Sequence, residues 1–229
     1  MKHTTTRREI LAASLSGLFA GGSLKAEIPP KKALNSFTEA PIDWISCRRA
    51  RTIHSFGAVA ISLSGPSAYV VASVSEKGMI FIEPYYWIPE SHPLSKQPKQ
   101  IGVRRTRGAF CDPEAILAEI IVLRRRFKTE KIAFDPCSTT LMAEKLTDSG
   151  IVMVEYSGAK VRSAGGCFLR AIKKNWVRHP DSPILNAEIL ERLPDGNHNP
   201  SNCGAWATIM AVDLTVRWIP DLRRNLYGA

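Results

Sequence analysis

The hydrophobic and polar positions of the first half of the chain form three apolar runs joined by polar turns. The runs cover residues 57–64, 68–74 and 79–88 and are rich in small, β-branched and aromatic residues. Such residues favour strands. Because the turns Gly65-Pro66-Ser67 and Glu76-Lys77-Gly78 are short, the pattern predicts an antiparallel three-strand meander.

The second half alternates between helical and strand patterns. Asp112 before Pro113 is typical of a helix start, with Asp as N-cap and Pro at the first helical position. The further expected elements are a strand at 131–135, a helix at 138–148, a strand at 151–156, a helix around 168–172, a short strand or turn at 176–179, a helix at 184–193 and a final helix at 203–218. The fold class predicted is α/β, with an antiparallel three-strand meander followed by parallel strands in one mixed sheet flanked by helices.

The strand at 131–135 ends in a carboxylate, Asp135, and Pro136 follows at once. Open α/β sheets bind their ligands outside the carboxyl ends of the strands. An Asp before a Pro also starts turns and caps helices. On this dipeptide alone, a functional carboxylate and a simple helix cap are both open.

The composition is that of a soluble globular protein, with 45% hydrophobic and 23% charged residues among 229. The net charge of +10 suits a polyanion partner, either nucleic acid or an acidic membrane surface. The candidate phosphate contacts are Arg104, Arg105 and Arg107 in the loop 89–112, and Arg124 and Arg125 near a helix end. A solvated loop is the alternative. No two of the five cysteines have C-x-x-C spacing, so neither a zinc knuckle nor a redox dithiol is indicated.

The amino terminus has features of an export signal. Thr6-Arg7-Arg8-Glu9-Ile10-Leu11 resembles the twin-arginine motif and precedes a mildly apolar run. Residues 1–26 are therefore expected to be a twin-arginine-like signal or an amino-terminal helix, too short and Gly-interrupted for a stable membrane span. A basic linker is expected at 27–55, the main domain at 56–219 and a tail at 220–229. The location is cytoplasmic without a working signal, and periplasmic or exported with one.

Several segments together resemble the nuclease domain of the phage terminase large subunit. These segments are Tyr85-Tyr86-Trp87-Ile88-Pro89, Ile132-Ala133-Phe134-Asp135-Pro136, Met153-Val154-Glu155-Tyr156, Val177-Arg178-His179-Pro180 and Cys203-Gly204-Ala205-Trp206. The similarity covers about residues 57–212, in the family's order and spacing. It implies a ribonuclease-H-like fold, metal-dependent DNA cleavage in phage DNA packaging, double-stranded DNA as a partner, and separate terminase or portal components.

In that family, three carboxylates hold the Mg²⁺ or Mn²⁺ ions of a two-metal site. The resemblance places Asp135 at the second of these positions, as catalytic and metal-binding residue. Ser62 and Cys203 fall at the first and third. Mg²⁺ prefers several hard carboxylate oxygens, so we expect cleavage to be impaired or lost. Asp213 cannot substitute, because it lies ten residues beyond Cys203, about 15 Å along a helix.

No G-x-x-x-x-G-K-[ST] phosphate loop occurs, so DNA packaging by this chain alone is not expected. Three other functions stay open. The chain could be a non-catalytic DNA-binding module, held to phosphate by its basic residues. It could be a thiol enzyme that pairs Cys203 with His179 or His198, since a cysteine at a helix start can have a lowered pKa. It could also be an exported protein of unrelated function.

Overall fold

The computed structural model describes residues 52–62, 64–96, 100–180, 182–192 and 202–228. The twin-arginine-like segment 1–26 and the linker up to residue 51 lie outside this range, as does His198. The expectations for export and location therefore stay predictions.

The described strands form one mixed sheet. They are β1 (Thr52–Ala60), β2 (Ser67–Ser75), β3 (Ile80–Pro89), β4 (Val103–Thr106), β5 (Lys131–Phe134), β6 (Val152–Glu155) and β7 (Val177–Arg178). The order is β4-β3-β2-β1-β5-β6, and β7 also pairs with β3. Strands β1 to β3 are antiparallel, whereas β5 runs parallel to β1 and β6 parallel to β5. The predicted meander followed by parallel strands is confirmed.

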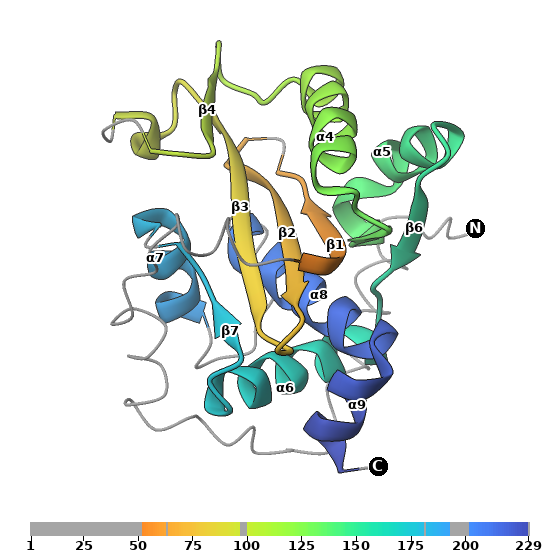
Figure 1. Ribbon diagram of the computed structural model, residues 1–229. Helices are drawn as coiled ribbons and strands as arrows, with labels where there is room; N and C mark the ends of the chain where they lie inside the picture. Colours follow the sequence, from red (N-terminus) through yellow and green to blue (C-terminus); the bar gives the residue numbers. More distant parts are fainter. Residues whose placement is uncertain (1–51, 63, 97–99, 181, 193–201, 229) are drawn as a thin grey trace, which may run out of the picture.

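Helices cover both faces of this sheet (Figure 1). They are α4 (Pro113–Phe127), α5 (Pro136–Asp148), α6 (Ala159–Lys173), α7 (Pro183–Arg192), α8 (Cys203–Trp218) and α9 (Pro220–Tyr227), with a short 3-10 helix η1 (Pro93–Lys96). None of these described helices has the length and apolar character needed to cross a membrane.

Two hydrophobic cores lie on opposite faces of the sheet, and β1 contributes to both in alternation. Ala58 and Ala60 pack in the core shared with α6, α7, α8 and α9. Val59, and Ile61 just beyond the end of β1, pack in the core shared with α4 and α5. Successive side chains of a strand point to opposite faces. A sheet covered on both sides therefore needs the nearly continuous apolar strands that the sequence shows.

The two helices on the α4 side start in the same way. The Asp112 carboxylate accepts a hydrogen bond from the Glu114 N–H at 3.0 Å, and Pro113 is the first helical residue. The Asp135 carboxylate accepts one from the Cys137 N–H at 2.9 Å, before Pro136. The helix start predicted at Asp112 is confirmed. The capping interpretation of Asp135 is also correct.

Three boundaries differ from those expected. Strand β1 begins at Thr52, inside the expected linker 27–55. The loop 89–112 contains η1 and β4. The four residues of β4 pair with the edge of β3 through backbone groups. The expected tail 220–229 contains a helix, α9 (Pro220–Tyr227), with Leu222 and Leu226 buried. Short elements of this kind owe their stability to tertiary pairing and packing, which a local pattern does not reveal.

We expect Gly165→Ala to stabilise the protein. Gly165 lies inside α6, and a β-carbon added there would meet no described atom within 4 Å. Alanine should therefore raise the free energy of unfolding by about 0.5–1 kcal/mol, because glycine is costly within a helix. Urea denaturation followed by circular dichroism measures this change. A loss of stability would show that neighbouring atoms fill the space into which the alanine β-carbon must fit.

Candidate functional site

The candidate site lies where β1 and β5 end. The two strands are parallel and adjacent, with Val59 paired to Phe134. Asp135 follows Phe134 directly, and Ser62 lies just beyond Ala60, the last residue of β1. The carboxyl ends of these strands therefore place both residues at the same edge of the sheet, which is where open α/β sheets carry ligands.

Cys203 reaches this edge from the start of α8. Its side chain is buried, and the pKa of its thiol is raised by burial first, then by the charge of Glu188 and by Cys111 and Asp135. The influence of Asp135 on this pKa means that the two side chains lie within electrostatic range. That Ser62, Asp135 and Cys203 act together as one site stays a prediction.

Ser62 shapes the turn that leads into β2. Its N–H donates to the Ser67 hydroxyl at 3.1 Å, and that hydroxyl donates to the Ser62 carbonyl at 3.1 Å. The Ser62 hydroxyl accepts a hydrogen bond from the Gly65 N–H at 3.0 Å. Ser62 therefore supplies a neutral, locally bonded hydroxyl and no charge.

Asp135 is 5% exposed and serves the first turn of α5 twice. Its carboxylate accepts the Cys137 N–H, and its carbonyl accepts the Thr139 hydroxyl at 2.5 Å. Negative charge at this helix end is stabilised by the helix dipole. One carboxylate oxygen is thus committed to the cap.

Glu188 of α7 is a buried carboxylate that the sequence interpretation missed. It accepts hydrogen bonds from the Ala205 N–H at 2.7 Å and from the Tyr86 hydroxyl at 3.2 Å. Ala205 is the third residue of α8, so Glu188 caps α8 from a neighbouring helix. No signal in the sequence marks it, because a single Glu in an amphipathic helix is usually exposed.

The comparisons with known proteins concern the fold. No protein-family model matches the sequence, and no curated protein matches it. Among solved structures, the HK97 bacteriophage large terminase aligns with 81% of this chain and 43% of its own, at 18% identity and a TM-score of 0.60. The large terminase of a thermophilic bacteriophage aligns with 72% of this chain and 40% of its own, at 11% identity and a TM-score of 0.51.

The chain has a terminase nuclease-like fold. The shared fold confirms the architecture that the terminase-like sequence segments implied. The chain spans less than half the length of these two large terminases.

The donors of this terminase-like site do not fit Mg²⁺ or Mn²⁺. The three positions that the resemblance marks hold one partly committed carboxylate (Asp135), one hydroxyl (Ser62) and one thiol (Cys203). Both ions prefer oxygen ligands, mostly carboxylates. The raised pKa of Cys203 keeps its thiol protonated near neutral pH. Within the part of the chain that the structure describes, no three His, Cys, Asp or Glu residues form a group suited to a metal.

The thiol-enzyme interpretation is not favoured by the same chemistry. An active cysteine has a lowered pKa, whereas burial raises that of Cys203. His179 is buried, with its Nδ1 at 2.9 Å from the Pro180 carbonyl oxygen. His198 lies outside the described residues.

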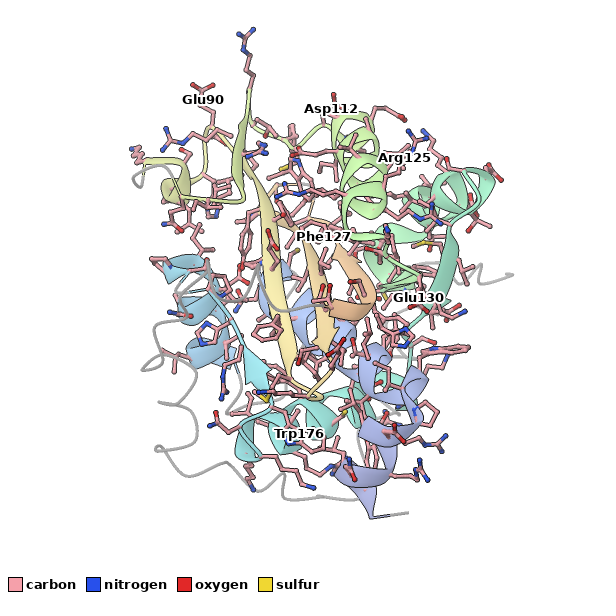
Figure 2. All side chains as sticks on the ribbon, in the orientation of Figure 1. Glu90, Asp112, Arg125, Phe127, Glu130 and Trp176 are labelled. Carbon is pink, nitrogen blue, oxygen red and sulfur yellow. The ribbon has the colours of Figure 1, made fainter. Side chains whose placement is uncertain are left out.

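The five candidate phosphate contacts lie in two places, on or beside β4 and on α4. Arg105 and Arg107 are exposed near β4, and Arg125 is exposed on α4 (Figure 2). Arg104 pairs with the carboxylate of Glu119 at 3.0 Å. Arg124 is half-buried, and its charge opposes the rise that burial causes in the pKa of Tyr69. DNA contact by any of the five stays a prediction.

We expect Cys137 to react first among the described cysteines with iodoacetamide at a mildly alkaline pH of about 8, close to the ordinary thiol pKa. It is exposed, whereas Cys111, Cys167 and Cys203 are buried. The Asp135 charge raises the pKa of Cys137, so Asp135→Asn should increase its thiolate fraction and speed its alkylation several-fold. Peptide mass spectrometry after timed quenching measures both results. Faster labelling of Cys203 than of Cys137 would instead support the thiol enzyme.

Proposed function

We propose that this chain is a terminase nuclease-like domain that binds double-stranded DNA and has lost metal-dependent cleavage. The observation that carries the proposal is the donor set at the ends of β1 and β5. Of the three positions that the resemblance marks, only Asp135 is a carboxylate, whereas Ser62 is a hydroxyl and Cys203 a buried, protonated thiol.

Cleavage of a phosphodiester by two metal ions needs both ions held tightly. The ions activate a water molecule and stabilise the leaving oxygen, and several carboxylate oxygens must converge to hold them. Asp135 could supply one such oxygen, with Mg²⁺ or Mn²⁺ as the ion if any activity remains. Glu188 is buried, and its Oε2 atom already accepts two hydrogen bonds at the start of α8, so we do not expect that oxygen to replace a missing metal ligand.

The DNA-binding part of the proposal has support from the charge of the chain. A net charge of +10 attracts the phosphate backbone, and Arg105, Arg107 and Arg125 are exposed. The terminase-like fold suggests separate terminase or portal components as protein partners. Because the matched terminases are more than twice as long as their aligned part, these partners are proposals as well.

The test restores the two missing carboxylates. Wild-type protein and the Ser62→Asp/Cys203→Asp variant are incubated with supercoiled plasmid and Mg²⁺ or Mn²⁺, and nicked and linear products are quantified on gels. We expect no metal-dependent cutting by the wild type. The double variant should cut at least ~100-fold faster than the background nicking measured in the wild-type reaction, since a single preorganised electrostatic contact typically changes rates by that order.

Two further variants make this result decisive. Adding Asp135→Asn to the double variant should abolish the restored cutting if Asp135 is the third ligand. The single substitution Ser62→Asp alters a half-buried turn and leaves the buried Cys203 untouched, so a Mn²⁺-dependent rise in its melting temperature reports metal binding even if Cys203→Asp unfolds. Wild-type cutting that disappears in Asp135→Asn would overturn the loss of catalysis.

A further inference from the structure

The outer face of α6 is a line of positive charge. Arg162, Arg170 and Lys173 are exposed, and their spacing places them on one side of the helix, with Gly166 between them. The opposite side carries the buried residues Ala164, Cys167, Phe168, Ala171 and Ile172. The helix contains no acidic residue.

Helix α9 extends this positive surface. Arg170 lies 4.7 Å over the Tyr227 ring, and Lys174 donates to the Asn225 carbonyl. These contacts hold α6 and α9 side by side. Arg223 is exposed on α9, and its neighbour Arg224 is paired with Asp221. We call Arg162, Arg170, Lys173, Lys174 and Arg223 the α6–α9 basic face.

Two consecutive glycines, Gly165 and Gly166, leave a gap without side chains on α6, next to its basic residues. A β-carbon at Gly165 would meet no described atom within 4 Å, and one at Gly166 would meet only the Arg170 guanidinium, at 3.7 Å. Glycine inside a helix costs stability relative to alanine. No close packing within the described fold requires either residue. Glycine at such a place permits the close approach of another molecule to the helix backbone.

We propose that the α6–α9 basic face binds the phosphate backbone of double-stranded DNA, as a contact separate from the Asp135 site. A membrane surface fits less well, because a helix lying on lipid buries exposed apolar side chains. Leu222 and Leu226 of α9 point into the core, and Tyr227 is the one strongly exposed large hydrophobic side chain among the described residues of α6 and α9. The exposed groups are cationic side chains that suit phosphate and glycines that leave the helix backbone accessible.

The face is remote from the candidate site. Helix α6 contacts α8 near its carboxyl end, where Arg217 donates to the Ser163 hydroxyl at 2.6 Å. Arg217 is fourteen residues beyond Cys203, about 20 Å along the helix. The face also lies away from the arginines on β4 and α4, because α6 and α9 lie at the bottom of Figure 1 and α4 and β4 at the top. Figure 2 shows Trp176, near α6, far from Arg125 on α4. The inference rests on the DNA partner proposed above, but not on the loss of cleavage.

The test measures binding of the full chain to a fluorescent duplex of about 30 base pairs by anisotropy, between roughly 50 and 300 mM NaCl. The variant Arg162→Gln/Arg170→Gln/Lys173→Gln is compared with Arg105→Gln/Arg107→Gln/Arg125→Gln, which removes the same charge from β4 and α4. We expect the α6 variant to bind at least ~10-fold more weakly at about 100 mM salt. Its log–log salt slope should fall by about 2.7, because each neutralised phosphate accounts for ~0.9 of that slope.

The outcomes separate this inference from the proposed function. Unchanged affinity and slope in the α6 variant, with a loss in the β4 and α4 variant, would overturn the α6–α9 face and leave DNA binding intact. Unchanged binding in both variants would overturn the α6–α9 face and the contacts by Arg105, Arg107 and Arg125, but DNA binding itself would stand. No binding by the wild type would overturn both the inference and the proposed function. Gly165→Leu, which leaves the charge unchanged, should weaken binding; unchanged affinity contradicts the close approach. Binding to phosphatidylserine vesicles that depends on α6, without DNA binding, would also overturn it.

Discussion

Substituting Gly204 with alanine is expected to lower the free energy of unfolding by about 3 kcal/mol or more, at the upper end of overpacking effects. A β-carbon at this position would lie 1.8 Å from the Tyr86 hydroxyl and 2.6 Å from a Glu188 carboxylate oxygen. Tyr86 is 1% exposed, so its ring cannot move away easily. The added methyl group would push apart the hydrogen bonds that cap α8.

Urea denaturation measures the loss, and Gly165→Ala serves as the matched control, because the same substitution there meets open space. The double variant Gly204→Ala/Tyr86→Phe tests the cause. Removing the hydroxyl eliminates the closest contact but leaves the ring carbon at 2.4 Å, so partial recovery is expected. A Gly204→Ala protein as stable as the wild type would contradict this packing.

Replacing Asp213 with alanine is expected to cost about 3 kcal/mol, the lower part of the range for breaking a buried charge pair. The side chain is fully buried and accepts hydrogen bonds from the Tyr156 hydroxyl at 2.8 Å and from Arg217. The Arg217 side chain is 41% exposed and can regain water, which keeps the cost moderate. The buried Tyr156 hydroxyl would lose its carboxylate partner.

Thermal and urea unfolding of Asp213→Ala should be compared with Tyr156→Phe, which removes one hydrogen bond and should cost only about 1–1.5 kcal/mol. A second readout follows from Cys167. Burial, with the nearby Asp213 charge, raises the pKa of this thiol to about 12, so Asp213→Ala should make Cys167 more reactive in alkaline solution. A cost no greater than that of Tyr156→Phe would show that the ion pair adds nothing.

The position of Asp213 also explains why sequence reasoning could set it aside. The helical pattern of α8 placed it far along the helix from Cys203, and the structure joins it to Tyr156 and Arg217 instead. Local sequence patterns also predicted the three-strand meander, from its apolar runs and short turns, and the helix start at Asp112, from the Asp-Pro pair. These features follow from local side-chain spacing and capping, which the chain carries in contiguous segments.

Features that depend on distant partners were not predictable. Glu188 looks like an ordinary helix residue, and its role depends on Tyr86, 102 positions earlier. Strand β4 has four residues and forms by pairing with the edge of β3. In α9, two leucines four residues apart are too few to distinguish a docked helix from a tail. A single sequence lists the residues that make these contacts, but it does not show which of them lie close together in the fold.

The packing of α8 has a consequence for synthesis of the protein. This helix packs against β1, β2 and β5, so one face of the first strands finds its cover in a segment made more than a hundred residues later. At ribosomal speed this gap lasts on the order of ten seconds. During that time the nascent chain presents bare apolar strands, which are prone to aggregate. We therefore expect this chain to benefit more from chaperone binding during translation than a protein whose contacts are mostly local.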